Sequence, residues 1–121
     1  MHRLNIVHRD LKLENIIIYP ETLHVKIIDF GFSTVLKGDR KLTFSCGTPH
    51  YLAPELALKK DYHGKPADMW ALGVILYALL TGKLPFSADF ETDLYRRISL
   101  GKFQIPSFIS VAARRVIASL L

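Results

Sequence analysis

Apolar residues in the first third of the chain occur in short β-branched runs around a polar centre. Residues 6–18 read IVHRDLKLENIII, so apolar flanks enclose a segment with acidic, basic and amide side chains. Such flanks predict short buried strands, and the polar centre is then a loop held between them. The runs at 15–19 and 23–28 are separated by a Pro-Glu-Thr turn, which predicts a hairpin.

After this hairpin the spacing of apolar residues changes to that of helices. Residues 33–54 contain several chain breakers and no clear periodicity, which predicts a long loop of a kind that is usually functional or disordered. The stretch from 66 to about 80 is apolar nearly all round, which predicts a buried central helix that Gly82 ends. Further helices are predicted at residues 55–60, 91–100 and 111–121, the last one capped by Ser110.

Composition narrows the class of protein. The chain has 121 residues, half of them hydrophobic, which suits one small ordered domain. The net charge is +5, but the basic residues form scattered pairs, so solvated faces explain them better than nucleic-acid binding. The single cysteine excludes an internal disulfide. The longest apolar stretch is well short of the roughly 20 residues that span a bilayer, and no signal peptide is visible, so we expect a cytoplasmic or nuclear protein.

The polar loop carries side chains that suit phosphoryl transfer. Asp10 offers a carboxylate that accepts a proton from a hydroxyl, and Lys12 offers a positive charge beside it. Asn15 and Asp29 offer the hard oxygen ligands that Mg²⁺ prefers, often together with substrate phosphates. A base, a cation and a magnesium pair suit in-line transfer of a phosphoryl group. Each residue alone is better explained by an ordinary polar turn, whereas the whole set in this order is hard to explain that way.

Four motifs in this order resemble the C-terminal lobe of a serine/threonine protein kinase. They read HRDLKLEN from residue 8, DFG from 29, GTPHYLAPE from 47 and DMWALG from 68. Lys12, two residues after the aspartate, is typical of the serine/threonine branch. Within that branch the chain is similar to the calmodulin-dependent and AMP-activated-like kinases. The resemblance implies an α+β fold, mainly α with short β-hairpins. Residues 1–121 would then form a partial kinase domain, from the catalytic loop to the helix after the G helix.

The resemblance also implies the catalytic and cofactor-binding residues. Asp10 corresponds to the catalytic base that accepts the proton of the substrate hydroxyl. Lys12 corresponds to a catalytic contact of the γ-phosphate of ATP. Asn15 and Asp29 correspond to ligands of Mg²⁺ and hence to cofactor-binding residues. The implied cofactors are ATP and Mg²⁺, and the implied partners are protein substrates with serine or threonine.

Other positions receive substrate-binding or structural roles from the same resemblance. Thr48 would bond the catalytic aspartate and lysine and favour a serine or threonine substrate. Glu14 would contact a basic residue upstream of the phosphoacceptor, and Glu55 would close the activation segment and pair with an arginine late in the kinase domain. The implied structural residues are His8, Arg9, Phe30, Gly31, Asp68 and Trp70. Gly31 is expected to allow a backbone conformation that a side chain would oppose.

The activation loop departs from the family pattern. In most such kinases the activating threonine lies three residues before the glycine of the GTP motif, and here that position is Phe44. Thr43 and Ser45 flank it, and both are candidate phosphorylation sites. Arg9, which the resemblance pairs with a phosphate on this loop, therefore has no assured partner.

The nucleotide-holding motifs of such kinases do not occur in the sequence. A glycine-rich loop, the lysine of the ATP-pairing strand, the C-helix glutamate and the adenine-binding hinge are not found, so we expect the N-lobe to be absent. Two hypotheses follow. The parent protein phosphorylates protein serine or threonine with ATP, or the chain as it stands is a catalytically incompetent lobe that binds substrates or partners.

Overall fold

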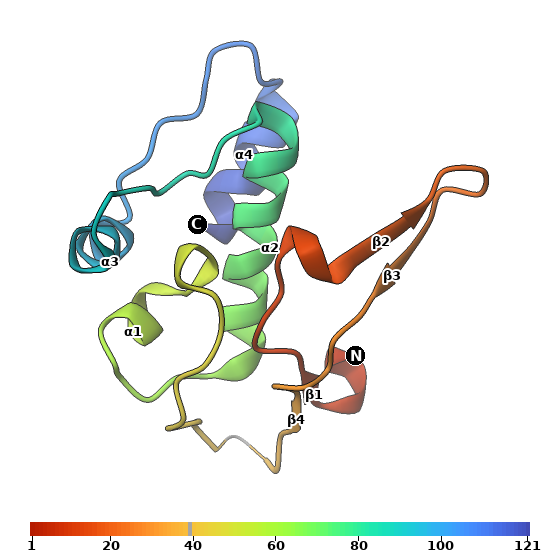
Figure 1. Ribbon diagram of the computed structural model, residues 1–121, viewed down its shortest axis with the longest axis vertical. Coiled ribbons are helices and arrows are strands. Elements are labelled where there is room, and N and C mark those ends of the chain that lie inside the picture. The colour runs from red at the N-terminus through yellow and green to blue at the C-terminus, as the bar shows by residue number, and fades with distance from the viewer. Residues whose placement is uncertain (39) are drawn as a thin grey trace.

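The computed structural model describes residues 1–38 and 40–121 as small strand pairs beside a group of helices (Figure 1). In chain order the elements are η1 (His2–Leu4), β1 (Ile6–Val7), η2 (Leu13–Asn15), β2 (Ile16–Tyr19), β3 (His24–Ile27), β4 (Thr34–Val35), η3 (Pro49–Tyr51), α1 (Pro54–Ala57), α2 (Gly64–Thr81), α3 (Glu91–Leu100) and α4 (Val111–Leu120). In the described part the strands form two antiparallel pairs. The mixed α and β composition agrees with the predicted class.

Strands β2 and β3 form the predicted hairpin. Ile16 pairs with Ile27 and Tyr19 pairs with His24 in an antiparallel register, so this prediction is confirmed. The expectation that both strands are buried is wrong, because the hairpin extends away from the helices (Figure 1) and Ile18 is 57% exposed. Burial of a β-branched run depends on an element that covers it, and no described element covers most of this hairpin.

Strand β1 pairs with β4, which the sequence did not predict. Val7 pairs with Thr34, and the side chain of Val7 is fully buried. Both β4 and η3 lie within residues 33–54, so the expectation of a loop throughout this stretch is wrong. Elements of two or three residues are too short to produce a periodic pattern, and they are defined by their tertiary partners instead.

Helix α2 is the element around which the other helices are arranged (Figure 1). It packs against α4, η3 and β1, and it ends where Gly82 takes a left-handed conformation with φ 69° and its N–H bonds the carbonyl of Ala78. One face of α2 faces the core, with Val74 fully buried, whereas Leu79 is 66% exposed. The prediction of a central helix is confirmed, but the prediction that it is buried all round is wrong.

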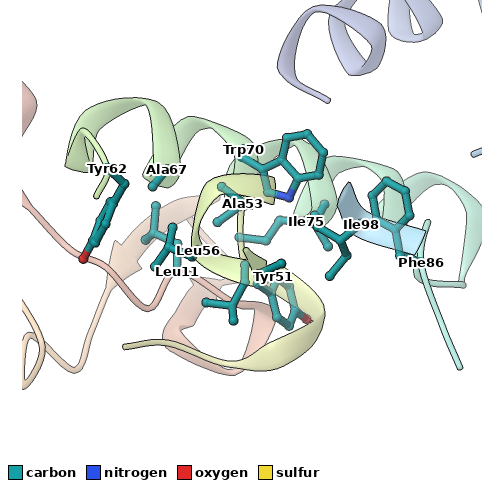
Figure 2. Packing of buried hydrophobic residues seen from close by; sticks show 14 of the residues in the cluster. Leu11, Tyr51, Ala53, Leu56, Tyr62, Ala67, Trp70, Ile75, Phe86 and Ile98 are labelled. Carbon is teal, nitrogen blue, oxygen red and sulfur yellow. The ribbon is translucent and has the colours of Figure 1, made fainter. Parts of the chain in front are cut away.

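The hydrophobic core lies between α2, α3, η3 and α1. Figure 2 shows its large side chains pointing toward one another, and Trp70 stacks on Phe86 with ring centroids 5.8 Å apart. The buried cluster consists of Leu11, Tyr51, Leu52, Ala53, Leu56, Ala57, Tyr62, Ala67, Trp70, Ala71, Val74, Ile75, Phe86, Leu94 and Ile98. Because Leu11 belongs to the polar loop, the core holds that loop directly.

The remaining helices follow the predictions closely. Helix α3 has the predicted bounds, and α4 begins after Ser110, whose hydroxyl accepts a hydrogen bond from the N–H of Ala113 at 3.3 Å. Helix α1 is shorter than predicted and ends at Ala57. None of the helices in the described residues is long and apolar enough to span a bilayer, as expected from the sequence.

Candidate active site

A buried carboxylate on helix α2 fixes the start of the polar loop. Oδ2 of Asp68 accepts the backbone N–H of His8 and its Oδ1 accepts that of Arg9, both at 2.9 Å. The ring of His2 lies 2.7 Å from the same carboxylate, which is only 2% exposed. Arg9 has a left-handed conformation with φ 68°, which is uncommon for a residue with a side chain. The paired hydrogen bonds to Asp68 stabilise this turn.

Three side chains meet beyond this turn. The hydroxyl of Thr48 donates to Oδ1 of Asp10 at 2.8 Å, and Nζ of Lys12 lies 3.0 Å from Oδ2 of Asp10. Nζ of Lys12 also donates to Oγ1 of Thr48 at 3.0 Å, so the three groups form a closed triangle. The hydrogen bond to Asp10 raises the pKa of Lys12, which keeps its ammonium group charged. Asp10 is 6% exposed, so this charged pair is fixed in position.

The imidazole of His8 connects the loop to the segment after β3. Its Nδ1 accepts the N–H of Asp10 at 3.3 Å and its Nε2 donates to the carbonyl of Ile28 at 3.0 Å. Because a carbonyl only accepts and an amide N–H only donates, these partners define a neutral ring with hydrogen on Nε2. The ring of Phe30 contacts His8 edge to face at 5.0 Å. His8 therefore positions residues 28–30 relative to Asp10.

Asn15 and Asp29 present oxygen atoms that could hold a cation. The amide nitrogen of Asn15 donates to the carbonyl of Asp10 at 2.9 Å, and its amide oxygen has no hydrogen-bond donor among the described residues. One carboxylate oxygen of Asp29 accepts the N–H of Gly31 at 3.2 Å and the other is unengaged within the same part of the chain. Free amide and carboxylate oxygens fit Mg²⁺, which needs few protein ligands when phosphates supply the rest. The described residues contain no group of three or more His, Cys, Asp or Glu side chains that could hold a metal.

The special backbone conformation of the DFG segment belongs to its first residue. Asp29 has φ 60°, whereas Gly31 does not have a positive φ. The expectation that Gly31 supplies the unusual conformation is therefore wrong. A Cβ at Gly31 would lie 3.1 Å from Oδ1 of Asp29, a tight contact that a small shift of this exposed side chain would relieve.

Residues 44–48 lie against the polar loop, and Gly47 makes this approach possible. Its φ is 118°, and a Cβ there would lie 2.8 Å from the carbonyl oxygen of Arg9. The side chain of Arg9 donates from Nε to the carbonyl of Phe32 at 2.5 Å and lies over the ring of Phe44 at 5.9 Å. Arg9, for which the sequence offered no assured phosphate partner, thus contacts the ring of Phe44. Phe44 occupies the position where the resemblance implies a threonine.

Sequence reasoning missed three residues that support this arrangement. His2 contacts Asp68, Gly47 allows the close approach, and the hydroxyl of Tyr62 donates to the carbonyl of Phe44 at 3.1 Å. Gly47 was visible within the GTP motif, whereas nothing in the sequence marked His2 or Tyr62. Burial raises the pKa of the neighbouring Cys46 thiol, so that thiol stays protonated at neutral pH.

Some of the predicted site residues are not brought into this cluster. Glu14 is exposed on η2, and Thr43 and Ser45 are exposed in the activation segment. Glu55 is half-buried at α1 and has no ion-pair partner in the described residues. Trp70 is buried in the core, and its indole N–H has no acceptor within the part that the structure describes.

We compared the sequence of the chain with those of known protein families. The protein kinase domain family matches residues 1–121. The chain belongs to the protein kinase family. This confirms the resemblance to a protein kinase that the four motifs indicated.

Individual relatives refine this placement. The chain is similar to "Probable serine/threonine-protein kinase HSL1" of Saccharomyces cerevisiae, with 43% identity over 120 residues. It is 48% identical over 120 residues to "Mitosis inducer protein kinase cdr1" of Schizosaccharomyces pombe, and 44% identical over 120 residues to "Sucrose non-fermenting protein kinase 1" of Fusarium virguliforme. Each match covers 99% of this chain but only 8%, 20% and 17% of the respective relative. The relatives are serine/threonine kinases of the AMP-activated type, as the sequence predicted.

Proposed function

We propose that this chain is the C-lobe part of a kinase domain that transfers the γ-phosphoryl group of ATP to serine or threonine hydroxyls of proteins. In this proposal residues 1–121 run from the catalytic loop to the helix after the G helix. The observation that carries it is the closed triangle of Asp10, Lys12 and Thr48 on a loop held by Asp68. A buried carboxylate beside a fixed ammonium is a suitable place to orient a hydroxyl and neutralise a phosphate.

Asp10 acts on the substrate hydroxyl in this proposal. The hydroxyl donates its hydrogen bond to the Asp10 carboxylate, which aims the oxygen at the γ-phosphorus and accepts the proton as the new P–O bond forms. The bond between the γ-phosphorus and the β–γ bridging oxygen breaks, and ADP leaves with that oxygen. Thr48 and Lys12 hold the carboxylate during this step, because each bonds one of its oxygens.

Asn15 and Asp29 would hold Mg²⁺ through their free oxygens, and Lys12 would contact the transferred phosphate. Bound Mg²⁺ supplies neutralising charge for the phosphates. Asn15 is positioned for this role because its amide nitrogen is fixed on the carbonyl of Asp10, which turns its oxygen away from that bond. Asp29 is positioned by its own left-handed backbone and by the N–H of Gly31.

Residues around the triangle support a protein substrate. The Thr48 hydroxyl beside the carboxylate favours a small aliphatic alcohol, and the exposed carboxylate of Glu14 suits a basic residue upstream of the phosphoacceptor. Arg9, His8, Phe30 and Trp70 would serve as supports that do not touch the substrate.

A second candidate function has its own supporting observation. The exposed apolar side chains of the β2–β3 hairpin suit a chain that binds another protein and does not itself catalyse phosphoryl transfer. In that case the half-buried Glu55 and the polar loop would serve recognition only.

A chimera tests the first candidate. This chain would replace the matching 120 residues of "Mitosis inducer protein kinase cdr1", to which it is 48% identical. Transfer of radioactive phosphate from ATP to a serine peptide with an upstream arginine would be measured. We expect Asp10→Asn to lower the rate by about 10²- to 10⁴-fold, because it removes the base, and the exposed Asp89→Asn control to retain it. Equal rates for the Asp10→Asn chimera and the unchanged chimera would contradict the proposal.

The 121-residue chain alone, assayed with the same peptide and the same Asp10→Asn control, separates the two candidates. Activity above the control would exclude the incompetent lobe. Activity equal to the control, together with an active chimera, would assign catalysis only to the complete domain.

A further inference from the structure

A hollow at the start of helix α2 carries positive charge. It has a volume of about 270 Å³ and lies between the segment after β4 and the first turn of α2. Arg40 lines it from the segment and Lys65 lines it from the helix, together with His63. None of the described lining residues is acidic. The basic residues that are scattered along the sequence thus include a pair that the fold brings together.

Neither of these two cations is neutralised by a described residue. Nζ of Lys65 donates to the amide oxygen of Asn5 at 2.7 Å, and this partner carries no charge. Arg40 is exposed and forms no hydrogen bond or ion pair with any residue that the structure describes. Two positive groups around one hollow repel each other, so a negatively charged group placed there is favoured.

Asn5 connects the two walls of this hollow. Its backbone carbonyl accepts the N–H of Leu36 at 2.8 Å, and its side chain accepts the ammonium group of Lys65. Leu36 begins the segment that carries Arg40, so the backbone hydrogen bond fixes where this segment starts relative to α2. The position of the hollow is therefore defined by backbone contacts as well as by side chains.

The positive surface extends beyond this hollow. A second hollow of about 260 Å³ shares Leu36 and Arg40 with the first, and Lys37 and Lys41 line it. Its described lining residues also include no acidic side chain. A small anion would occupy only one hollow, whereas a peptide with several carboxylates would contact cations in both. No phenylalanine, tyrosine or tryptophan is among the described residues of the first hollow, so nucleic-acid bases would find no aromatic side chain to stack on there.

We propose that this surface binds an acidic segment of a partner protein, with Asp or Glu side chains of that segment in the hollow at the start of α2. Arg40 and Lys65 would donate charge-assisted hydrogen bonds to these carboxylates. Exposed charge pairs are individually weak and are screened by salt, so the affinity comes from several pairs together and falls as the salt concentration rises. The interaction does not depend on catalysis by this chain.

Fluorescence anisotropy with the full 121-residue chain tests the class of partner. The probe is a labelled peptide of alternating glutamate and serine, and the control peptide has glutamine in place of glutamate. We expect only the acidic peptide to bind, and we expect the same peptide without label to displace it. Single-stranded DNA and phosphatidylserine vesicles serve as competitors at the same concentration of charge. Stronger displacement by either of them than by the acidic peptide, or no binding of the acidic peptide, would overturn the proposal.

A matched pair of charge variants shows whether the hollow is responsible. Arg40→Gln/Lys65→Gln removes both cations of the hollow, and Lys102→Gln/Arg115→Gln removes two exposed cations elsewhere and lowers the net charge equally. We expect the first variant to bind the acidic peptide about 3- to 30-fold more weakly than the unchanged chain, and the second to differ from it by less than about 2-fold. Equal weakening by the two variants would show a response to net charge alone and would overturn the proposal.

A single substitution separates loss of binding from loss of folding. Arg40→Gln breaks no hydrogen bond or ion pair among the described residues, so we expect its melting temperature to equal that of the unchanged chain. We also expect it to weaken binding of the acidic peptide by about 2- to 5-fold. Unchanged affinity of this folded variant would contradict a role of the hollow in binding.

Discussion

The polar loop and the β2–β3 hairpin carry parts of the same candidate site, but they are held in different ways. Asp10 is 6% exposed, its side chain is bonded by Thr48 and Lys12, and its loop is fixed on Asp68. Asp29 follows an exposed hairpin, and its side chain accepts one hydrogen bond from its own turn. The candidate base is thus preorganised by tertiary packing, whereas the candidate metal ligand is positioned by local backbone conformation.

Among the variants that test this difference, we expect loss of the Asp68 carboxylate to lower the free energy of unfolding the most. Asp68→Ala leaves the buried N–H of His8 and the partly buried N–H of Arg9 without an acceptor. Each unsatisfied group costs about 1–3 kcal/mol, so we expect a loss of about 4 kcal/mol in the free energy of unfolding. Urea denaturation monitored by Trp70 fluorescence measures it. The exposed Asp89→Ala control should change the free energy of unfolding by less than about 0.5 kcal/mol. Equal effects of the two variants would show that Asp68 does not hold the loop.

Truncating one isoleucine in the core and one in the hairpin compares how much each region contributes to the free energy of unfolding. Ile98 is fully buried and Ile18 is 57% exposed. We expect Ile98→Ala to lower the free energy of unfolding by about 3 kcal/mol, because it leaves a cavity, and Ile18→Ala by less than about 1 kcal/mol. The same denaturation experiment measures both. A large loss from Ile18→Ala would mean that the hairpin is packed in solution.

A methyl group at Gly47 tests the close approach of the activation segment to the polar loop. Gly47 and Gly101 both have a positive φ, but only at Gly47 would a Cβ meet other atoms, among them the Arg9 carbonyl oxygen at 2.8 Å. We therefore expect Gly47→Ala to cost about 2 kcal/mol more than Gly101→Ala in the free energy of unfolding. Thermal or urea unfolding of the two variants measures the difference. Equal costs would contradict the contact between Gly47 and Arg9.

The polar loop could be predicted from the sequence because most of its functional side chains lie close together along the chain. Asp10, Lys12 and Asn15 lie within one short segment, and the predicted bond from Thr48 to Asp10 and Lys12 is present. The family placement was predictable for the same reason, since it depends on short motifs in a fixed order. The proposed roles of Asp10, Asn15 and Asp29 in catalysis and metal binding stay predictions.

Features that depend on distant partners could not be predicted. Strand β4 exists because β1 lies beside it, and the exposure of Ile18 depends on which elements cover the hairpin. The contacts of His2 with Asp68 and of Arg9 with the Phe44 ring join residues far apart in the sequence. A pattern of apolar and polar residues shows what a segment can bury, but it does not show what will lie against it.

The smallest effect we expect is the pH dependence of the Lys12–Asp10 pair. The hydrogen bond to Asp10 raises the pKa of Lys12 above its ordinary value of 10.5, so the folded state retains a proton that the unfolded state releases. The stabilisation is therefore complete below that value and is lost as the pH rises through the raised pKa. Because Lys12 is partly exposed, we expect this pair to contribute less than about 1 kcal/mol.

Urea unfolding of the unchanged chain and of Lys12→Met, at several pH values between about 9 and about 12, measures this contribution. Burial raises the pKa values of Tyr51 and Tyr62, and burial together with the hydrogen bond to Glu91 raises the pKa of Tyr95 to about 12. These tyrosines also lower stability at alkaline pH, but they are present in both proteins and cancel in the difference. We expect the stability difference between the two proteins to shrink across this range. A difference that stays constant would mean that Lys12 does not stabilise the carboxylate of Asp10.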